Sequence, residues 1–155
     1  MKTYDELVND CLTRVKELFP WDLIDEIEAD KKILLVDVSE PAEFSRAHIP
    51  NSINVPRGIL ESSCEYDYDE TVPALAGGKT SDIVVICRSG KRSVLAANTL
   101  LQMGFNKVRS LKTGLQGWND GEYDLFDEQQ QAVDPDLAED YYTTKLRPNQ
   151  KTPTD

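Results

Sequence analysis

The sequence predicts an α/β domain in which a mostly parallel central sheet is flanked by helices. Two continuous apolar runs, residues 33–36 and 83–86, have the pattern of strands that are buried on both faces of a sheet. Segments with the apolar spacing of helices alternate with these runs, and this alternation indicates βαβ units. A chain of 155 residues is long enough for one domain with its own hydrophobic core and too short for two domains of typical size.

An amphipathic helix is predicted first, over residues 4–19. Apolar residues recur there at spacings of three and four, which is the spacing of one helix face. Thr3 and Glu6 form a capping-box pattern at its start, and Pro20 ends it. Cys11 falls on the apolar face, so we expect it to be a buried small hydrophobic residue.

The next elements are a second short helix and a shorter strand. Trp21, Ile24 and Ile27 are expected on one packing face of that helix. The strand is predicted at residues 53–55. Residues 61–79 are rich in acidic, glycine and proline residues, and we predict them to be mostly loop.

The second half of the predicted sheet begins with the strand at residues 83–86. A helix is predicted over residues 94–103, with Gly104 as its C-cap. Residues 108–111 form another predicted strand, and a short helix is expected to begin at Leu115.

The periodic pattern decays after residue 127. A short helix over residues 137–146 is expected to dock through Tyr141, Tyr142 and Leu146, and the last ten residues are expected to be disordered.

We therefore predict three parts of the chain. They are an N-terminal helical extension (1–19), a domain (20–126) and an acidic, partly disordered C-terminal segment (127–155).

Charge and hydropathy exclude several classes of protein. The formal net charge of −11 argues against a nucleic-acid partner, because a phosphate-binding surface needs clustered Lys and Arg. The acidity is concentrated after Trp118 and is expected to form a solvated face. No apolar run approaches the roughly 20 residues of a membrane span, and the first residues lack the apolar region of a signal peptide. These features predict a cytoplasmic protein without a membrane partner.

The chain has three cysteines, Cys11, Cys64 and Cys87, and His48 is its single histidine. No Cys-x-x-Cys pair occurs, so the sequence predicts no metal site and no cofactor. The lone histidine also argues against Cys-His catalysis. Cys64 stands beside acidic residues, which should raise the pKa of its thiol and make it unreactive.

Cys87 is the candidate nucleophile. It follows a predicted buried strand and precedes a predicted helix, at the end of a parallel sheet where such folds bind ligands. Backbone N–H groups at a helix N-terminus can hold an anion, and Gly90 permits the tight turn that they require. Arg88, Lys91 and Arg92 add positive charge, so this loop favours a thiolate without histidine. The alternative is that Cys87 is a buried structural thiol, but this would not explain the three positive charges that follow it.

Residues 87–93, Cys-Arg-Ser-Gly-Lys-Arg-Ser, resemble the active-site run Cys-Arg-Ser-Gly-x-Arg-Ser of single-domain rhodaneses. Residues 37–44, 48–56 and 104–118 resemble further motifs of that family in the same order, so the resemblance covers about residues 21–126. The departures from the family pattern lie outside the cysteine loop, such as Ser39 where the family usually has Arg.

The resemblance implies a rhodanese-like sandwich and a sulfurtransferase. Cys87 would take sulfane sulfur from thiosulfate or a protein persulfide and pass it to cyanide or a thiol. A sulfur-carrier protein is a candidate partner. The substrate-binding residues implied are Arg88, Ser89, Gly90, Lys91, Arg92 and Ser93. Helix capping is the role we expect for Ser93.

Outside the loop, structural roles are expected. His48 should be held by a hydrogen bond, Asp37 should order the turn that follows it, and Trp21 and Trp118 should be packing residues.

Two other functions stay open. The first is a non-catalytic rhodanese-like module for protein interaction, which the presence of Cys87 opposes. The second is a phosphatase or arsenate reductase. Enzymes of that kind use Cys-x5-Arg, whereas this loop is Cys-x4-Arg, and a shorter ring suits one sulfur atom better than a phosphate.

Overall fold

The computed structural model describes residues 1–154, and within them five parallel strands form one sheet in the order β1-β5-β4-β2-β3. The α/β class with a parallel sheet is therefore confirmed. The strands are β1 (Lys16–Leu18), β2 (Leu34–Asp37), β3 (Ile53–Asn54), β4 (Ile83–Ile86) and β5 (Val108–Leu111).

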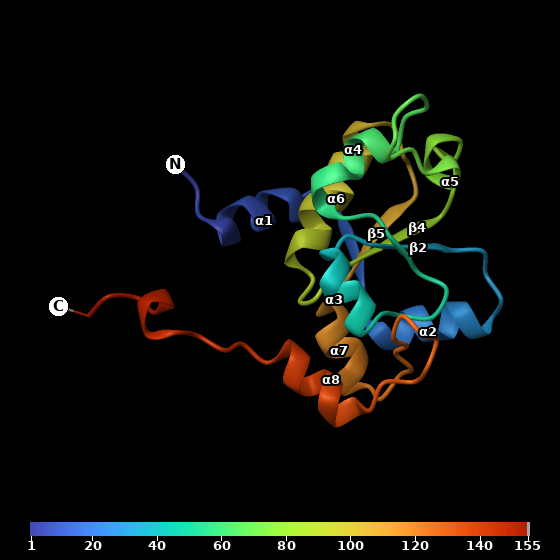
Figure 1. Ribbon diagram of the computed structural model, residues 1–155. Coiled ribbons are helices and arrows are strands. Elements are labelled where there is room, and N and C mark those ends of the chain that lie inside the picture. Colours follow the sequence, from blue (N-terminus) through green and yellow to red (C-terminus); the bar gives the residue numbers. More distant parts are fainter. Residues whose placement is uncertain (155) are drawn as a thin grey trace.

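Helices cover both faces of this sheet. In Figure 1, α4, α5 and α6 lie above the strands, and α2, α7 and α8 lie below them. Helix α1 packs against α6, whereas α2 and α8 pack against α7. The α-helices are α1 (Tyr4–Leu12), α2 (Pro20–Glu28), α3 (Pro41–Arg46), α4 (Leu60–Ser63), α5 (Pro73–Ala76), α6 (Lys91–Gln102), α7 (Gly114–Asp120) and α8 (Pro135–Tyr142), and the short 3-10 helices are η1 (Arg57–Ile59) and η2 (Pro148–Gln150).

Strand β4 is the centre of the core. All four of its side chains are fully buried. Ile83 and Val85 belong to the apolar cluster on one face of the sheet, and Val84 and Ile86 belong to the cluster on the other. Successive side chains of a strand point to opposite faces, so a strand covered on both sides needs an apolar residue at every position. This is why the run at 83–86 identified the strand.

The predicted helix over residues 4–19 is wrong in its second half. Helix α1 ends at Leu12, and β1 pairs with the edge of β5. Val8 and Cys11 are buried in the cluster beside α6, whereas Leu18 is buried in the cluster on the opposite face. The chain therefore passes from one face of the sheet to the other at this edge. A helical stripe of apolar residues does not reveal that its two ends belong to different cores.

One further expectation about local structure is wrong, the packing role of Trp21. Trp21 is 54% exposed and stacks on Phe19, while Leu23 is the fully buried residue of α2. Residues 61–79 are mostly loop, as predicted, although they include the end of α4 and all of α5. Leu60 and Leu75 anchor these short helices with fully buried side chains.

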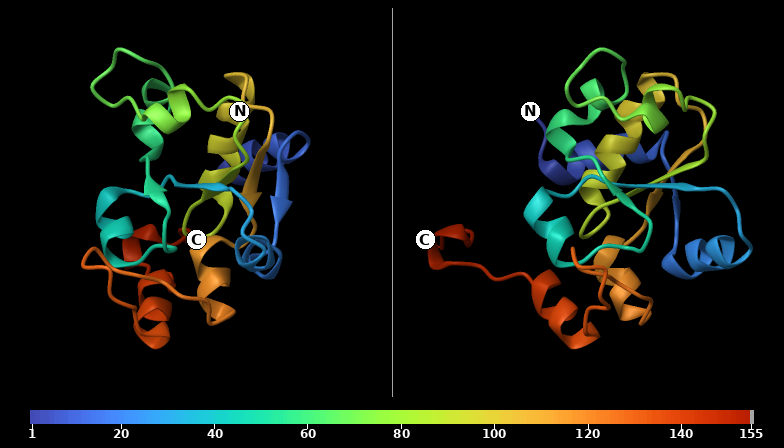
Figure 2. Two further views of the ribbon diagram at one scale, coloured as in Figure 1. Left: turned by 90° about the vertical axis from the view of Figure 1, so that its right-hand side faces the viewer. Right: turned by 45° about the vertical axis from the view of Figure 1, so that its right-hand side comes forward.

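The segment between α7 and the end of α8, residues 121–142, packs against the rest of the domain. Phe126 forms antiparallel bridges with His48 and Ala132, and α8 buries Ala138 and Tyr142 in the cluster beside α7. The docking role expected for Leu146 is wrong, because this side chain is 53% exposed. Beyond α8 the chain extends away from the sheet (Figure 2). Among residues 1–154, none of the helices has the length and apolar character that a membrane crossing requires.

We expect deletion of residues 1–19 to lower the thermal midpoint by at least about 5 °C, because it removes the edge strand β1 and uncovers apolar surface beside α6. Circular dichroism would measure this midpoint, and deletion from residue 147 onward is the control, since residues 147–154 are exposed. An unchanged midpoint in the first variant would show that residues 1–19 are an independent extension.

Candidate active site

Cys87 directly follows the central strand β4, where the neighbouring strand β2 ends at Asp37. The chain order reverses at this point of the sheet, because β3 lies outside β2 on one side and β5 lies beside β4 on the other. Open parallel sheets bind ligands in the crevice at such a reversal, outside the carboxyl ends of the strands. The candidate nucleophile thus lies where the fold makes a site.

The Cys87 sulfur accepts hydrogen bonds from the first turn of α6. The Gly90 N–H lies 3.1 Å from Sγ and the Ser93 N–H lies 3.3 Å from it, and the Ser93 hydroxyl oxygen lies 3.4 Å away. The helix has no side-chain cap, and its N-cap position is Gly90. The expected capping role of Ser93 is therefore wrong. Sγ itself occupies the place of a capping acceptor, where backbone donors and the helix dipole favour negative charge.

Two glycines let other parts of the backbone hold this loop. Gly90 has φ +91°, and Gly114 has φ +60°. A Cβ at Gly114 would lie 2.4 Å from the Cys87 carbonyl oxygen and 2.6 Å from that of Arg88. The first turn of α7 instead comes close enough for Leu115 N–H to donate to the Cys87 carbonyl at 2.9 Å. Gly114 was not among the predicted site residues, although it directly precedes the predicted helix.

Arg92 forms a two-point ion pair with Glu43 of α3. Its two terminal nitrogens lie 2.8 Å and 2.9 Å from the carboxylate oxygens. The hydrogen bond to Arg92 holds the pKa of Glu43 below its usual value, and the same bond raises the pKa of Arg92. The charge of Arg92 also acts on Cys87. Glu43 lies inside a motif quoted for the family, yet its pairing is visible only in three dimensions.

The other two loop cations have partners from the terminal segments. Lys91 Nζ lies 2.8 Å from a carboxylate oxygen of Asp5 on α1. The Arg88 guanidinium donates to the backbone carbonyl of Tyr142 at the end of α8, at 2.8 Å. The sequence predicted that all three cations lie near the sulfur. In the structure the Lys91 side chain points to the surface and the Arg88 side chain points to the C-terminal helix.

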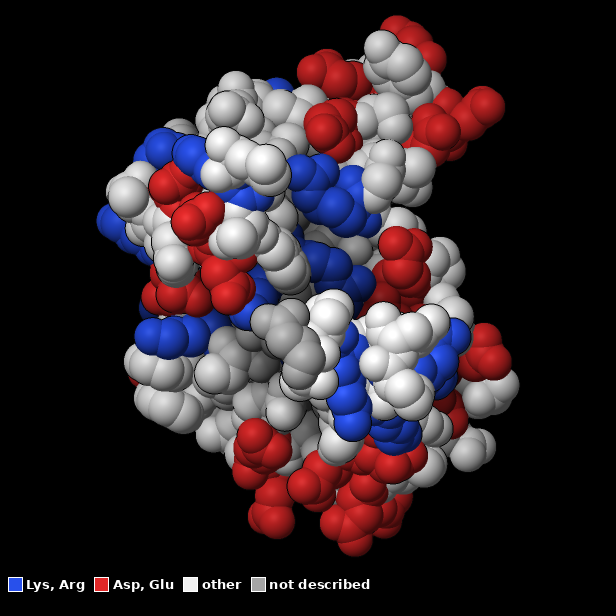
Figure 3. All heavy atoms as spheres, turned by 90° about the vertical axis from the view of Figure 1, so that its left-hand side faces the viewer, with Lys and Arg blue, Asp and Glu red and all other residues white. Residues whose placement is uncertain are grey.

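A pocket of about 410 Å³ lies at the mouth of the loop, and it is lined by Glu43, Arg88, Ser89, Arg92, Gln116, Tyr142 and Thr144. Ser89 is exposed at this mouth, whereas Cys87 is fully buried beneath it. On the face of the molecule that carries both chain ends, Lys and Arg side chains gather around a central hollow, with acidic side chains beside them and at the upper and lower ends (Figure 3). The site therefore offers local positive charge in an acidic protein, which suits an anionic substrate.

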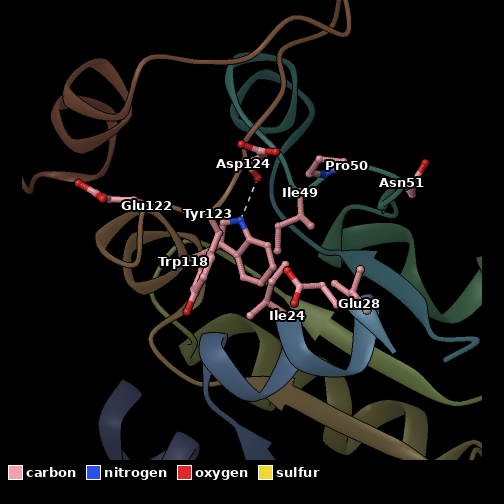
Figure 4. Close-up of a pocket in the computed structure, with 10 residues that line it drawn as sticks. Ile24, Glu28, Ile49, Pro50, Asn51, Trp118, Glu122, Tyr123 and Asp124 are labelled. Carbon is pink, nitrogen blue, oxygen red and sulfur yellow. Dashed lines mark hydrogen bonds between the residues drawn. The ribbon is translucent and has the colours of Figure 1, made fainter. Parts of the chain in front are cut away.

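A second pocket, of about 350 Å³, lies between α2, residues 49–51 and the end of α7 (Figure 4). Its floor includes Ile24, Ile49 and Trp118, and the Trp118 indole donates to the Asp124 carbonyl at 2.9 Å. None of its lining residues belongs to the cysteine loop, whereas Arg88, Ser89 and Arg92 of that loop line the first pocket. Trp118 is 1% exposed, which confirms its expected packing role.

Burial alone does not distinguish Cys87, because Cys11 and Cys64 are buried as well. Burial raises the pKa of the Cys64 thiol, and the acidic neighbours Glu65 and Glu61 are lesser causes. The expected rise in the pKa of Cys64 is therefore confirmed, but its main cause is burial and not the acidic neighbours. The backbone donors around Sγ are what set Cys87 apart.

Known proteins show which family this chain belongs to. The sequence pattern of a family described as the rhodanese-like domain matches residues 20–120. A protein of Allochromatium vinosum named sulfurtransferase is 30% identical over 104 residues, which cover 67% of this chain and 88% of that protein. The putative sulfur carrier protein of Bacillus subtilis is 31% identical over 93 residues, covering 60% of this chain. The chain spans 45% of that protein's length.

Among solved structures, a Rhodopseudomonas palustris protein of unknown function, described as a possible tyrosine phosphatase, superposes with a TM-score of 0.73. The match covers 79% of this chain and 93% of that one, at 24% identity. At this identity the likeness supports the fold and carries nothing about the chemistry.

Asp37 is a buried carboxyl group beside the site. One of its oxygens accepts the Ser39 N–H at 2.9 Å, which confirms that Asp37 orders the turn after it. Among residues 1–154, the other oxygen, Oδ2, has no hydrogen-bond partner. Burial raises the pKa of Asp37 to about 6. Ser39 stands where the resembled family usually has Arg, so position 39 supplies no cation to offset this burial. His48 is held as expected, since its ring nitrogen lies 2.8 Å from the Phe44 carbonyl.

We expect the raised pKa of Asp37 to make stability fall as the pH rises. The folded chain keeps this proton to about pH 6, whereas an unfolded chain loses it near pH 3.8, so ionisation in that window disfavours folding. Relative to Asp37→Asn, the free energy of unfolding of the wild type should fall by about 2–3 kcal/mol between pH 4 and pH 7. Urea unfolding at several pH values would measure both free energies, and a wild type that keeps or gains stability relative to Asp37→Asn between pH 4 and pH 7 would contradict the assignment.

Proposed function

The chain belongs to the rhodanese-like domain family, and from this premise we propose that it is a sulfurtransferase in which Cys87 carries sulfane sulfur as a persulfide. The observation that supports this proposal most is the position of Sγ at the N-terminus of α6, within hydrogen-bond distance of two backbone N–H groups. These donors stabilise a thiolate, which is the nucleophilic form of cysteine.

In the first half-reaction the Cys87 thiolate attacks the outer sulfur of an anionic donor such as thiosulfate. A sulfur–sulfur bond forms to Sγ, the donor's own sulfur–sulfur bond breaks, and sulfite leaves with the bonding electron pair. A persulfide donor reacts in the same way and leaves as a thiolate. Arg92 and Arg88 line the pocket through which the donor approaches, and their charges attract it.

In the second half-reaction a nucleophilic acceptor, a thiolate or cyanide, attacks the outer sulfur of the persulfide. The bond between that sulfur and Sγ breaks, and its electron pair returns to Cys87 as a thiolate. The same N–H groups of Gly90 and Ser93 then stabilise the leaving sulfur. One set of donors therefore serves both steps, because the charge on Sγ disappears in the first and returns in the second.

The ring that holds the sulfur supports sulfur transfer over phosphate chemistry. Residues 87–92 form Cys-x4-Arg, and the N–H groups of Gly90 and of Ser93, the residue after this run, point at Sγ itself. Arg92 is engaged at both terminal nitrogens by Glu43, so a carboxylate already balances the charge that a phosphate would need from this side chain. A non-catalytic interaction module is the alternative, and the complete set of donors around Cys87 argues against it.

A sulfur-carrier protein remains our proposed partner, and the cytoplasm remains the proposed location. One named relative, from Bacillus subtilis, is called a putative sulfur carrier protein. The mouth of the pocket is rimmed by exposed Ser89 and Thr144, so a cysteine or a terminus on a second protein has an open approach to it.

Incubation with thiosulfate should add one sulfur atom, about 32 Da, to the wild type and none to Cys87→Ala, because Sγ is the attacking atom. Intact-protein mass spectrometry would detect the addition, and cyanide should remove it with release of thiocyanate. Cys64→Ala is the matched control, since Cys64 is equally buried but its pKa is raised.

The proposal fails if the wild type gains no sulfur from thiosulfate or from a low-molecular-weight persulfide, and the interaction module then takes its place. Hydrolysis of p-nitrophenyl phosphate that depends on Cys87 would instead support the phosphatase alternative.

A further inference from the structure

Ser110 is a buried serine in the middle of β5, behind the cysteine loop. Its side chain is fully buried, and the residue paired with it on β4 is the apolar Val85. A hydroxyl group in such surroundings costs free energy unless it is hydrogen-bonded. Ser110 was not singled out by the sequence, where the signal is a polar residue between apolar ones in a buried strand.

The hydroxyl of Ser110 reaches the site through one intermediate. It donates to the Ser93 hydroxyl oxygen at 2.8 Å, and that oxygen lies 3.4 Å from Cys87 Sγ. Ser93 is also fully buried, in the first turn of α6. The three atoms form a continuous chain from strand β5 to the sulfur, shielded from solvent.

The direction of these bonds depends on the charge of the sulfur. A serine hydroxyl carries one proton and two lone pairs. When Cys87 is a thiol, its S–H can donate to Ser93, whose oxygen then accepts from both Cys87 and Ser110. When the sulfur is a thiolate it can only accept, so the Ser93 proton must turn toward Sγ. Ser110 donates to Ser93 in both states, and in the second state it polarises the Ser93 O–H toward the anion.

We propose that Ser110 is a positioning residue, which stabilises the Cys87 thiolate by donating to Ser93 and so aiming the Ser93 hydroxyl proton at the sulfur. This inference rests on the proposed function, in which Sγ is anionic before the first half-reaction and after the second. Ser110 touches neither the donor nor the acceptor. It acts through Ser93, and it favours the two states in which Sγ carries charge over the persulfide, in which Sγ is a neutral bridging sulfur.

The charged and titratable groups that act on Cys87 come from other elements. They are Arg92 on α6, paired with Glu43 of α3, and Tyr4 on α1, whose phenol lies near the charges of Arg92, Lys91 and Asp5. Replacement of Ser110 by alanine removes one hydroxyl and alters none of these groups. A change in the pH dependence of the sulfur would therefore report on the hydroxyl chain.

The test is the pH dependence of Cys87 alkylation by iodoacetamide, followed by mass spectrometry of the peptide that contains Cys87. Alkylation requires the thiolate but no sulfur transfer. We expect Ser110→Ala to move the midpoint of the rate profile upward by about half a pH unit to one unit, which makes alkylation about 3–10 times slower below the midpoint. Ser110→Thr keeps the hydroxyl and should restore the profile.

Two further variants separate this role from a general loss of packing. Ser63→Ala removes another fully buried hydroxyl, which donates to the Leu60 carbonyl at 2.6 Å, and it should leave the midpoint unchanged. Ser93→Ala should raise the midpoint by itself, and Ser110→Ala added to it should have no further effect, because the intermediate is gone. Should Ser110→Ala not fold, Ser110→Cys gives the same comparison with a weaker donor of similar size.

An unchanged midpoint in Ser110→Ala overturns the proposal, as does an equal shift in Ser63→Ala or a full effect of Ser110→Ala in the Ser93→Ala background. These results are independent of persulfide formation by the wild type. If the midpoint moves as expected but no donor loads sulfur, the hydroxyl chain stands and the sulfurtransferase function fails.

Discussion

The first turn of α6 has backbone N–H groups without partners inside the helix, and the Cys87 sulfur lies where two of them converge. The same hydrogen bonds provide an acceptor for the free N–H groups at the start of the helix and stabilise a thiolate at Cys87. The turn at Gly90, the close approach of α7 to the Cys87 carbonyl, and the chain from Ser110 through Ser93 all serve to keep the sulfur at that point. Local structure and the proposed chemistry therefore depend on one geometry.

The sheet explains why that geometry is held firmly. Strand β4 is buried on both faces and ends at the reversal of the strand order, so the residue after it is fixed by the core on two sides. Cys87 inherits this rigidity and lies fully beneath the surface. In the proposed reaction the donor therefore brings its sulfur atom to the loop through the pocket that Arg88 and Arg92 line.

The charges of the site are balanced across the whole chain. Glu43 of α3 engages Arg92, Asp5 of α1 engages Lys91, and a carbonyl at the end of α8 engages Arg88. Two of these three partners lie outside residues 20–120, the part that matches the family pattern. The segments before and after that part thus supply partners for two of the three cations of the cysteine loop.

The sequence by itself determined the α/β class, the two buried strands, the cysteine loop and its order in the chain, because apolar periodicity and a contiguous loop are local properties. It also placed His48 and the turn at Asp37 correctly from short-range patterns. It could not separate the end of a helix from strand β1, since both offer an apolar stripe, and burial on opposite faces of the sheet is decided by long-range packing.

Tertiary structure alone decided which acid meets each arginine or lysine, that Asp37 has an oxygen without a partner, and that Ser110 stands behind Ser93. These facts depend on segments that are far apart in the chain, and hydrogen bonds and ion pairs extend over only a few ångströms. Their partners are therefore fixed when the sheet and helices pack, and no pattern along the sequence encodes them.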